Sequence, residues 1–253
     1  MLDFIRCFVL FMLLLAPAAA WASHPLQVED TATEGKGNYL FEMTGDYSKD
    51  NEFKSTKVTA VMTAGTGKHT DLSLEVPYRI LKPGPVPGQD ESGAGDARFK
   101  FKHQLFENEV KQSMAFLIFA DIPTGDADKG LGTGNVVWGV LLVDSQECRN
   151  KVLHLNVGYE AFGRDMKNWH FAQDYAIKFG LSVEHKMSGP FRFLTEFSGE
   201  SRKEAGVYSR PLNLLGGVIY DISRSWYVDL GVRVGLNKYA DDYVALGGAG
   251  WRF

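Results

Sequence analysis

The residues best suited to hold an ion lie in a glycine- and aspartate-rich stretch, residues 123–134. Asp126-x-Asp128-x-Gly130 begins like a calcium-binding loop, but Leu131 and Val137 stand where such a loop needs glycine and glutamate. Gly130-x-Gly132-x-Gly134 lacks the lysine and the following helix of a phosphate-binding loop. The stretch is typical of a turn built from residues that tolerate unusual backbone angles. We therefore expect no metal ion and no cofactor.

Nucleophilic catalysis needs a serine within hydrogen-bond reach of a histidine that acts as its base. The most suggestive motif is His154-Leu-Asn156, where asparagine stands in the place of the nucleophile. His103 and His185 are the other two candidates, and no serine stands two residues from any of the three histidines. The sequence thus predicts no nucleophile–base pair, no catalytic residues and a protein that is not an enzyme.

Ionisable residues alternate with apolar residues along most of the chain. In residues 174–186, for example, Tyr175, Ile177 and Phe179 are separated by single residues, and Lys178 is one of those. In a strand the two sets point to opposite faces, whereas a helix would scatter the charges around its circumference. The pattern indicates strands with one charged face. The residues predicted on that face are Glu42, Glu75, Arg79, Arg98, Lys100, Lys102, Glu160, Lys178, Glu184, Arg192, Glu196, Asp229 and Arg233.

The alternating segments number about twelve, an even number as in bacterial membrane barrels. Many exceed the usual length of about 5–6 residues for strands in soluble proteins and reach the roughly 9–11 that cross a tilted path through a bilayer. In residues 114–122 and 135–143 both faces are apolar, so the period cannot be read there. The predicted strands cover approximately residues 38–48, 53–64, 69–81, 96–106, 111–122, 135–145, 151–161, 172–186, 190–200, 211–222, 225–238 and 242–253.

Connections between the predicted strands alternate in length. Those on the side of both chain ends are short, namely Gly65–Lys68, Glu107–Val110, Gln146–Asn150, Met187–Gly189 and Ser223–Arg224. Four on the opposite side are long, namely Lys82–Gly95, Pro123–Gly134, Phe162–Phe171 and Ser201–Arg210. Short periplasmic turns and long extracellular loops are typical of bacterial membrane barrels, so we expect both chain ends in the periplasm.

Alternation alone does not say which face lies inside, because a soluble sandwich or lipocalin also alternates, with its apolar face inward. The length and number of the strands favour charged side chains inside and apolar ones in lipid. Tyr243, Trp251 and Phe253 share one face of the last predicted strand. This ending resembles the terminal strand that the barrel assembly machinery reads in outer-membrane proteins. The predicted fold is an all-β, transmembrane, antiparallel up-and-down β-barrel of about 12 strands.

The first residues predict export. The apolar run Phe8–Leu15 is shorter than the roughly 20 residues of a spanning helix, which disfavours a retained membrane anchor. Ala20-Trp21-Ala22 has the small-x-small form of a signal-peptidase site. We expect residues 1–22 to be a cleavable signal peptide, residues 23–37 a short periplasmic N-terminal segment, and residues 38–253 a barrel in the bacterial outer membrane. Residues 23–37 are too few for a folded plug, but could reach into the lumen as a stopper.

Composition narrows the partners. The formal net charge of −4 argues against nucleic acid and against a polybasic surface protein. After cleavage Cys148 is the single cysteine, so neither an intramolecular disulfide nor a thiolate metal cage can form. No later segment has 18 consecutive apolar residues, which excludes transmembrane helices. The expected partners are outer-membrane lipid and lipopolysaccharide, the barrel assembly machinery and a small-molecule solute.

Several motifs in the middle of the chain carry a family resemblance. They are Glu75-Val-Pro-Tyr-Arg79, Gly93-Ala-Gly-Asp96, Arg98-Phe-Lys-Phe-Lys102, Asp121-Ile-Pro-Thr-Gly-Asp126, Gly130-Leu-Gly-Thr-Gly134 and Leu153-His-Leu-Asn-Val-Gly-Tyr159. Through them residues 40–253 resemble the transporter-like outer-membrane family catalogued under the meta-pathway of phenol degradation. The resemblance implies a barrel that passes hydrophobic or aromatic compounds, and it brings no catalytic residues with it.

The charged inner face has two interpretations: a salt-bridged interior that fills the barrel, or a water-lined path whose charges select solutes. The function expected first is an outer-membrane channel or diffusion pathway for small molecules, hydrophobic or aromatic ones included. The alternative is a non-conducting structural or surface-binding barrel that acts through its extracellular loops. A third possibility is a lipid-modifying enzyme of the outer membrane, of the kind that uses serine and histidine on the lipid-facing wall.

Overall fold

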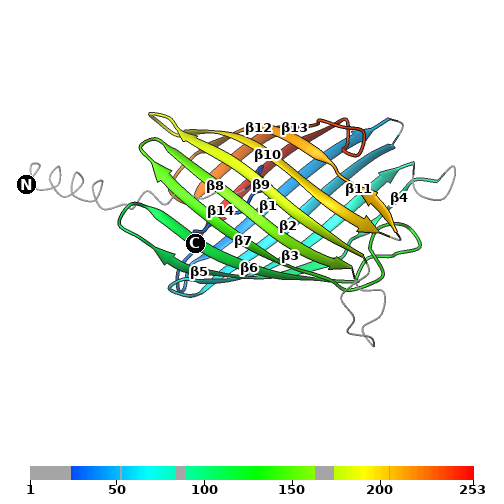
Figure 1. Cartoon of the computed structure of the whole chain (residues 1–253), viewed down its shortest axis with the longest axis horizontal. Coiled ribbons are helices and arrows are strands. Elements are labelled where there is room, and N and C mark those ends of the chain that lie inside the picture. The colour runs from blue at the N-terminus through cyan, green and yellow to red at the C-terminus, as the bar shows by residue number, and fades with distance from the viewer. Residues whose placement is uncertain (1–23, 52, 84–88, 163–173, 205) are drawn as a thin grey trace, which may run out of the picture.

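The computed structural model describes residues 24–51, 53–83, 89–162, 174–204 and 206–253, which form an antiparallel barrel of strands tilted to its axis (Figure 1). The predicted signal peptide, residues 1–22, lies outside the described residues. The strands are β1 (Tyr39–Asp50), β2 (Phe53–Gly67), β3 (Thr70–Lys82), β4 (Glu91–Ala94), β5 (Ala97–Glu107), β6 (Gln112–Ile122), β7 (Val137–Cys148), β8 (Lys151–Phe162), β9 (Asp174–Lys186), β10 (Phe191–Glu204), β11 (Val207–Ser209), β12 (Leu212–Asp221), β13 (Trp226–Gly235) and β14 (Tyr243–Arg252).

The sheet closes on itself. Every long strand pairs with the next one along the chain, and β14 pairs with β1 from Leu40↔Arg252 to Lys49↔Tyr243. Without the short strands β4 and β11, which only lengthen the wall beside β3 and β10, the fourteen strands leave twelve that span the barrel. Closure leaves no free edge among the twelve spanning strands, as hydrocarbon requires, because lipid cannot hydrogen-bond backbone groups. The predicted twelve-stranded fold is confirmed.

Strands β4 and β11 were not predicted, and they lie in connections that the sequence analysis treated as loops, Lys82–Gly95 and Ser201–Arg210. Strand β10 also continues to Glu204, beyond its predicted end at residue 200, while β13 stops at Gly235, short of residue 238. Strands β4 and β11 were missed because they are short: β4 has four residues and β11 three, too few to display an alternation.

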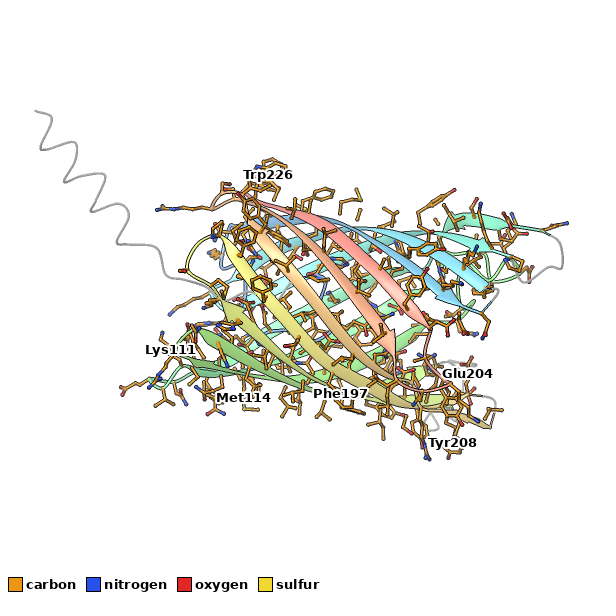
Figure 2. All side chains as sticks on the ribbon, turned by 90° about the horizontal axis from the view of Figure 1, so that it is seen from above. Lys111, Met114, Phe197, Glu204, Tyr208 and Trp226 are labelled. Carbon is orange, nitrogen blue, oxygen red and sulfur yellow. The ribbon has the colours of Figure 1, made fainter. Side chains whose placement is uncertain are left out.

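Apolar side chains cover the outside of the barrel. Leu230 and Val157 are 66% and 51% exposed, whereas the carboxyl-bearing Glu184 and Glu196 on the other face are 0% and 1% exposed. Figure 2 shows Met114, Phe197 and Trp226 at the outer surface. The predicted orientation, apolar residues outward and charged residues inward, is therefore the one that the structure has.

Aromatic side chains gather in a belt at each end of the outer surface. At the end where the short turns lie, called the terminal end below, Trp251 stacks on Trp226 at 5.4 Å and on Phe253 at 4.4 Å between ring centroids. At the opposite end, called the loop end, Tyr159 contacts Trp138 at 6.2 Å and Tyr175 at 6.0 Å. Such girdles are typical of membrane barrels, where amphipathic rings sit at the two lipid–water boundaries.

The structure explains why β6 and β7 show no alternation of apolar and polar residues. Leu117, Phe119 and Val143 are buried on the inner face, while Ile118 and Leu142 are exposed on the outer face. Part of the inner wall is thus apolar, so these two strands carry apolar residues on both sides. Within the described residues, no helix is long and apolar enough to cross a membrane.

The glycine- and aspartate-rich stretch is a loop folded over the loop end. Asp96 accepts hydrogen bonds from the backbone of Gly125 and Thr133, at 3.0 and 2.7 Å, and so ties the loop together. Gly130 and Gly134 have positive φ angles of 69° and 68°, which explains the choice of glycine there. The aspartates serve turn geometry, and the described residues hold no group of three or more His, Cys, Asp or Glu side chains that could bind a metal ion.

Candidate functional site: the barrel lumen

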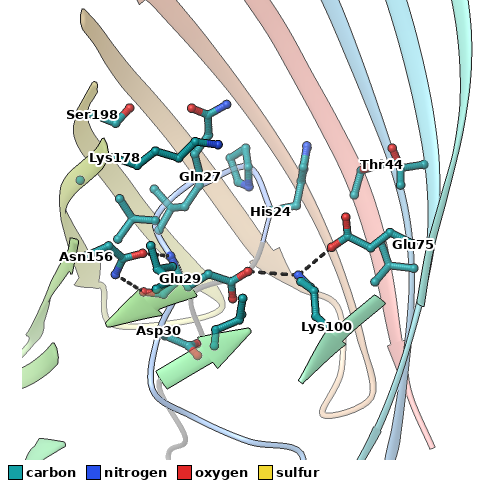
Figure 3. Close-up of a pocket in the computed structure, with 18 of the residues that line it drawn as sticks. His24, Gln27, Glu29, Asp30, Thr44, Glu75, Lys100, Asn156, Lys178 and Ser198 are labelled. Carbon is teal, nitrogen blue, oxygen red and sulfur yellow. Dashed lines mark hydrogen bonds and ion pairs between the residues drawn. The ribbon is translucent and has the colours of Figure 1, made fainter. Parts of the chain in front are cut away.

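Residues 24–37 are called the plug segment below, and the part from His24 to Glu34 lies inside the barrel (Figure 3). The segment joins the wall at the terminal end, where the Gly37 amide donates to the carbonyl oxygen of Gly65 at 2.8 Å. From there it extends to His24, which contacts Asp229 and Asp46 on β13 and β1. The sequence analysis assigned these residues to the periplasm and allowed that they could reach into the lumen. The structure places most of them in the lumen.

The plug segment has no strand partner along its middle, so wall side chains take up its backbone hydrogen bonds. Glu196 accepts from the amides of Gln27 and Val28 with one carboxylate oxygen, at 2.7 and 3.0 Å. Asn156 binds Glu29 twice: its amide oxygen accepts from the Glu29 N–H at 2.7 Å, and its NH2 group donates to the Glu29 carbonyl at 2.9 Å. These contacts hold the segment against β8 and β10.

Glu29 and Asp30 face the two lysines of β5. Lys100 Nζ lies 3.1 Å from Glu29 and 2.6 Å from Glu75, so that one ammonium bridges the plug segment and the wall (Figure 3). Lys102 Nζ lies 2.7 Å from Asp30. Burial raises the pKa of Glu29, but the charges of Lys100 and Lys102 outweigh it and lower that pKa to about 2. Glu29 is therefore ionised at every physiological pH.

His24 is held between two carboxylates. Its Nδ1 atom lies 2.6 Å from Asp229 and its Nε2 atom 3.4 Å from Asp46, which also pairs with Lys57 at 2.6 Å. Burial lowers the pKa of His24, but the hydrogen bonds and charges of the two carboxylates outweigh it and raise that pKa to about 9. The imidazole is thus protonated at neutral pH and donates to Asp229.

Glu34 marks the terminal end of the plug segment. Its amide donates to both carboxylate oxygens of Asp71, at 3.1 and 3.0 Å, and its own carboxylate lies 3.6 Å from Arg252 Nε. Burial, the largest effect, raises the pKa of Glu34 to about 7; Arg252 opposes this rise, and the charge of Asp71 adds to it.

Three apolar side chains of the plug segment fit against glycines and apolar residues of the wall. Pro25 lies over Gly231, where an added Cβ would come 3.0 Å from the proline ring. Val28 lies so close to Gly180 that a Cβ there would overlap its methyl group. Leu26 packs against the buried clusters that contain Leu40, Leu194, Ile219 and Tyr227, and Leu215, Val244 and Leu246. The close approach of the Pro25 and Val28 side chains to the wall backbone explains these glycines.

A cavity of about 670 Å³ remains beside the plug segment. Its lining combines charges with apolar side chains: Lys100, Lys102 and Arg233 contribute to it, and so do Leu117 and Phe119. The cavity is bounded on one side by the plug segment, whose residues from His24 to Asp30 all border it. The lumen is therefore narrowed, and it has both polar and apolar surfaces within reach of a small molecule.

All the residues predicted to line the lumen point to the inner side of the wall. Glu42, Glu75, Arg98, Lys100, Lys102, Lys178 and Arg233 border the cavity. Glu196 and Asp229 hold the plug segment. The others are engaged within the wall: Glu160 pairs with Lys178, Arg192 lies 3.4 Å from Glu184 and 3.0 Å from Asp221, and Arg79 donates to the Leu131 carbonyl at 3.5 Å. Some of the inner charges thus border the cavity, and others are paired within the wall.

Sequence reasoning missed the residues through which the plug segment is held. His24, Glu29 and Asp30 precede the first strand, where no alternation marks a lumen-facing position. Asp46 and Lys57 lie at the inner face of β1 and β2, in segments whose small polar residues hide the pattern. The available signal was charge: the plug segment carries Glu29, Asp30 and Glu34, which complement the predicted inward lysines of β5.

The structure corrects one prediction about catalytic residues. Ser145 and His154 are paired across β7 and β8, and the serine Oγ lies 2.8 Å from the histidine Nδ1. Serine and histidine are nine residues apart in sequence, so a search at short spacing could not find them. Both are buried, neither borders the cavity, and His154 Nε2 has no partner among the described residues. In the part of the chain that the structure describes, no carboxylate hydrogen-bonds the imidazole of His154.

The fold and lumen define a β-barrel of the class found in bacterial outer membranes, with an N-terminal segment inside. The chain belongs to the family described as "Putative MetA-pathway of phenol degradation", which matches residues 23–253. Among curated protein sequences none matches it.

Solved structures with the same fold include outer-membrane channels and porins. The COG4313 outer membrane channel from Pseudomonas putida F1 is similar over 94% of this chain and 100% of its own, with a TM-score of 0.67 and 12% identity. The NanC porin is similar over 83% and 98%, with a TM-score of 0.60 and 8% identity. The KdgM porin is similar over 85% and 99%, with a TM-score of 0.55 and 9% identity. At these identities the likeness is one of fold.

Proposed function

We propose that this protein is an outer-membrane channel for small molecules, in which the plug segment sets the width of the path. The observation that carries the proposal is the lumen itself: a closed barrel, apolar outside, encloses a cavity of about 670 Å³ bordered by ionised side chains. Charged side chains that line a pore are one means by which pores select solutes. The predicted location in the outer membrane, with both chain ends in the periplasm, is part of this proposal.

The lining of the cavity favours small amphipathic solutes. Apolar surface from Leu117, Phe119 and Leu141 lies close to the cationic groups of Lys100 and Arg98. A small aromatic molecule with one hydroxyl or carboxylate group would place its ring on the former and its polar group on the latter. The family description, which refers to phenol degradation, supports the same solute class.

The plug segment limits the path without being part of the wall. Its ties are side-chain hydrogen bonds and ion pairs to Glu196, Asn156 and Lys100, and none is a strand pairing. Removing the segment therefore leaves every strand pair of the barrel in place. A non-conducting structural barrel would be the better interpretation only if that removal opened no path.

The test is the conductance of the purified protein in planar bilayers, together with swelling of liposomes in phenol, benzoate or glucose. The wild-type protein is compared with a variant lacking residues 25–33, and the retained fast migration of unheated protein in SDS gels confirms that both barrels are closed. We expect a measurable current for the wild type, several-fold more for the deletion variant, and faster entry of the aromatic solutes than of glucose. Absence of current and of swelling in both proteins would refute a channel.

We also propose that the protein is not an enzyme. The Ser145–His154 pair is the one serine–histidine hydrogen bond among the described residues, and both side chains are buried. Phospholipid hydrolysis by refolded wild-type protein that disappears in a Ser145→Ala variant would contradict this part of the proposal.

A further inference from the structure

Three lysines form a lateral row on the outer surface at the loop end. Lys49 of β1 pairs with Lys54 of β2, and Lys54 pairs with Lys82 of β3. Neighbouring strands lie about 4.8 Å apart, so the three side chains project from adjacent positions of the wall. These residues are called the lysine row below.

The lysine row points outward and lies next to the apolar outer surface, on the side of the loop end. Residues two positions nearer the middle of the same strands, Tyr47, Thr56 and Ile80, share its face, and Tyr47 is 37% exposed. Tyr47 also contacts Tyr243 at 6.3 Å between ring centroids, within the aromatic belt of the loop end. The ammonium groups therefore sit at the level where a lipid headgroup would meet the barrel.

Like charges directly opposite each other destabilise a sheet, so an anion that binds adjacent lysines would stabilise it. Lys82 has an acidic partner, Asp90 at 3.5 Å, and both side chains are 58% exposed. Among the described residues no acidic group pairs with Lys49 or Lys54. The lysines of the lumen differ in this respect, since Lys57, Lys100, Lys102 and Lys178 each contact a carboxylate.

The row is confined to one sector of the barrel. At the same end of β7, β8, β9 and β14 the outward positions hold Trp138, Tyr159, Tyr175 and Tyr243 instead. Strand β10 carries an outward lysine there, Lys203, but the residues paired with it are Tyr175 and Tyr208, so it extends no row. A general electrostatic attraction to the membrane would not require three adjacent strands to carry it. The arrangement is suited to one multivalent anion bound at one place.

We propose that the lysine row binds the phosphate groups of lipopolysaccharide in the outer leaflet. The lipid A moiety carries phosphate at the height of the headgroups and acyl chains below it, which matches ammonium groups above an apolar belt. Lysine is a point-charge ligand for phosphate and needs no fixed geometry to bind it. The inference rests on the proposed outer-membrane location and orientation, and not on channel activity.

Native mass spectrometry of the full-length mature protein in detergent, titrated with bisphosphorylated lipid A, tests the proposal. The row variant is Lys49→Gln, Lys54→Gln, Lys82→Gln. The matched control removes three exposed lysines of the terminal end, Lys36→Gln, Lys68→Gln, Lys151→Gln, and a second control replaces the row by arginines. We expect about 100-fold weaker lipid A binding by the row variant, at about 1 kcal/mol per lysine, and near wild-type binding by both controls.

Two further probes identify the source of the phosphate. Dephosphorylated lipid A should bind wild type and row variant equally weakly, and millimolar inorganic phosphate should not displace bound lipid A. Equal binding of bisphosphorylated lipid A by wild type and row variant would overturn the proposal, as would displacement by inorganic phosphate alone. Conductance of the row variant is measured in parallel: a wild-type current with lost lipid binding separates this site from the lumen.

Discussion

His24 Nδ1 lies 2.6 Å from Asp229 Oδ1, which joins the residue at one end of the plug segment to the inner wall of β13. With Asp46 on the other ring nitrogen, this histidine is a group of the plug segment whose charge changes as the pH rises through about 9. The arrangement makes docking of the plug segment dependent on pH.

The direction of that dependence follows from the pKa of His24. It is about 9 in the docked state against 6.5 in a free chain, so its contribution to docking is full below pH 6.5 and is lost as the pH rises through about 9. Glu34 acts in the same direction at lower pH, because its docked pKa of about 7 lies above the ordinary 4.5. We expect single-channel conductance to rise between pH 6.5 and 9.5. His24→Gln should remove most of this rise, and a variant lacking residues 25–33 should show none; a rise that persists in the deletion variant would assign it to the wall.

Substituting Gly180 with alanine should displace the plug segment. The added Cβ would overlap Val28 and has no wall atom nearer than Ser198 Cβ at 3.8 Å, so the strand itself accommodates it. Gly216→Ala is the matched control, because that position has no atom within 4 Å of the added Cβ. We expect higher conductance for Gly180→Ala and an unchanged value for Gly216→Ala. Equal conductance of the two variants would show that Val28 does not limit the path.

Glu29→Gln should loosen the plug segment without opening the wall. Lys100 keeps Glu75 and Lys102 keeps Asp30, so both lysines stay paired while the segment loses the ion pairs of Glu29. Hydrogen bonds to charged groups contribute roughly 1.5–3 kcal/mol each, and we expect a loss of docking free energy of that order. The measurement is the rate at which a water-soluble thiol reagent labels Val28→Cys in a Cys148→Ser background, which should rise at least tenfold. Glu107→Gln, at an exposed turn, should leave the rate unchanged.

A charged side chain on the outer face should destabilise the barrel most near the middle of the membrane and least near its surfaces. Leu230 is 66% exposed near the middle of β13, and Leu230→Arg should lower the free energy of unfolding by about 2–4 kcal/mol in lipid vesicles. Ile222, 57% exposed beyond the end of β12 at the terminal end, offers the control, since Ile222→Arg should cost about 0–1 kcal/mol. Urea titration of both variants in vesicles measures the difference. Equal costs would mean that the apolar surface does not face hydrocarbon.

The sequence alone determined the strands and their orientation. Alternation in residues 174–186 separates Tyr175 and Ile177 from Lys178 without any tertiary information, because side chains of a strand alternate between its faces. The long and short connections then set the topology, since antiparallel neighbours joined by turns can only follow the chain. Where both faces are apolar, in β6 and β7, the alternation disappeared because the inner wall there is itself apolar.

Only the tertiary structure decided what fills the lumen and what surrounds the barrel. The sequence pattern could not show three features that combine residues from different parts of the chain. They are the Ser145–His154 pair, which joins two strands, the row Lys49–Lys54–Lys82, which joins three, and the path of the plug segment, which belongs to no strand. Strand patterns are local, with a period of two residues, whereas register and closure of the sheet bring together residues that are far apart in the chain. The alternation thus placed Glu196 and Asp229 on the inner face, and the closed barrel alone decided that Val28 and His24 would bind them.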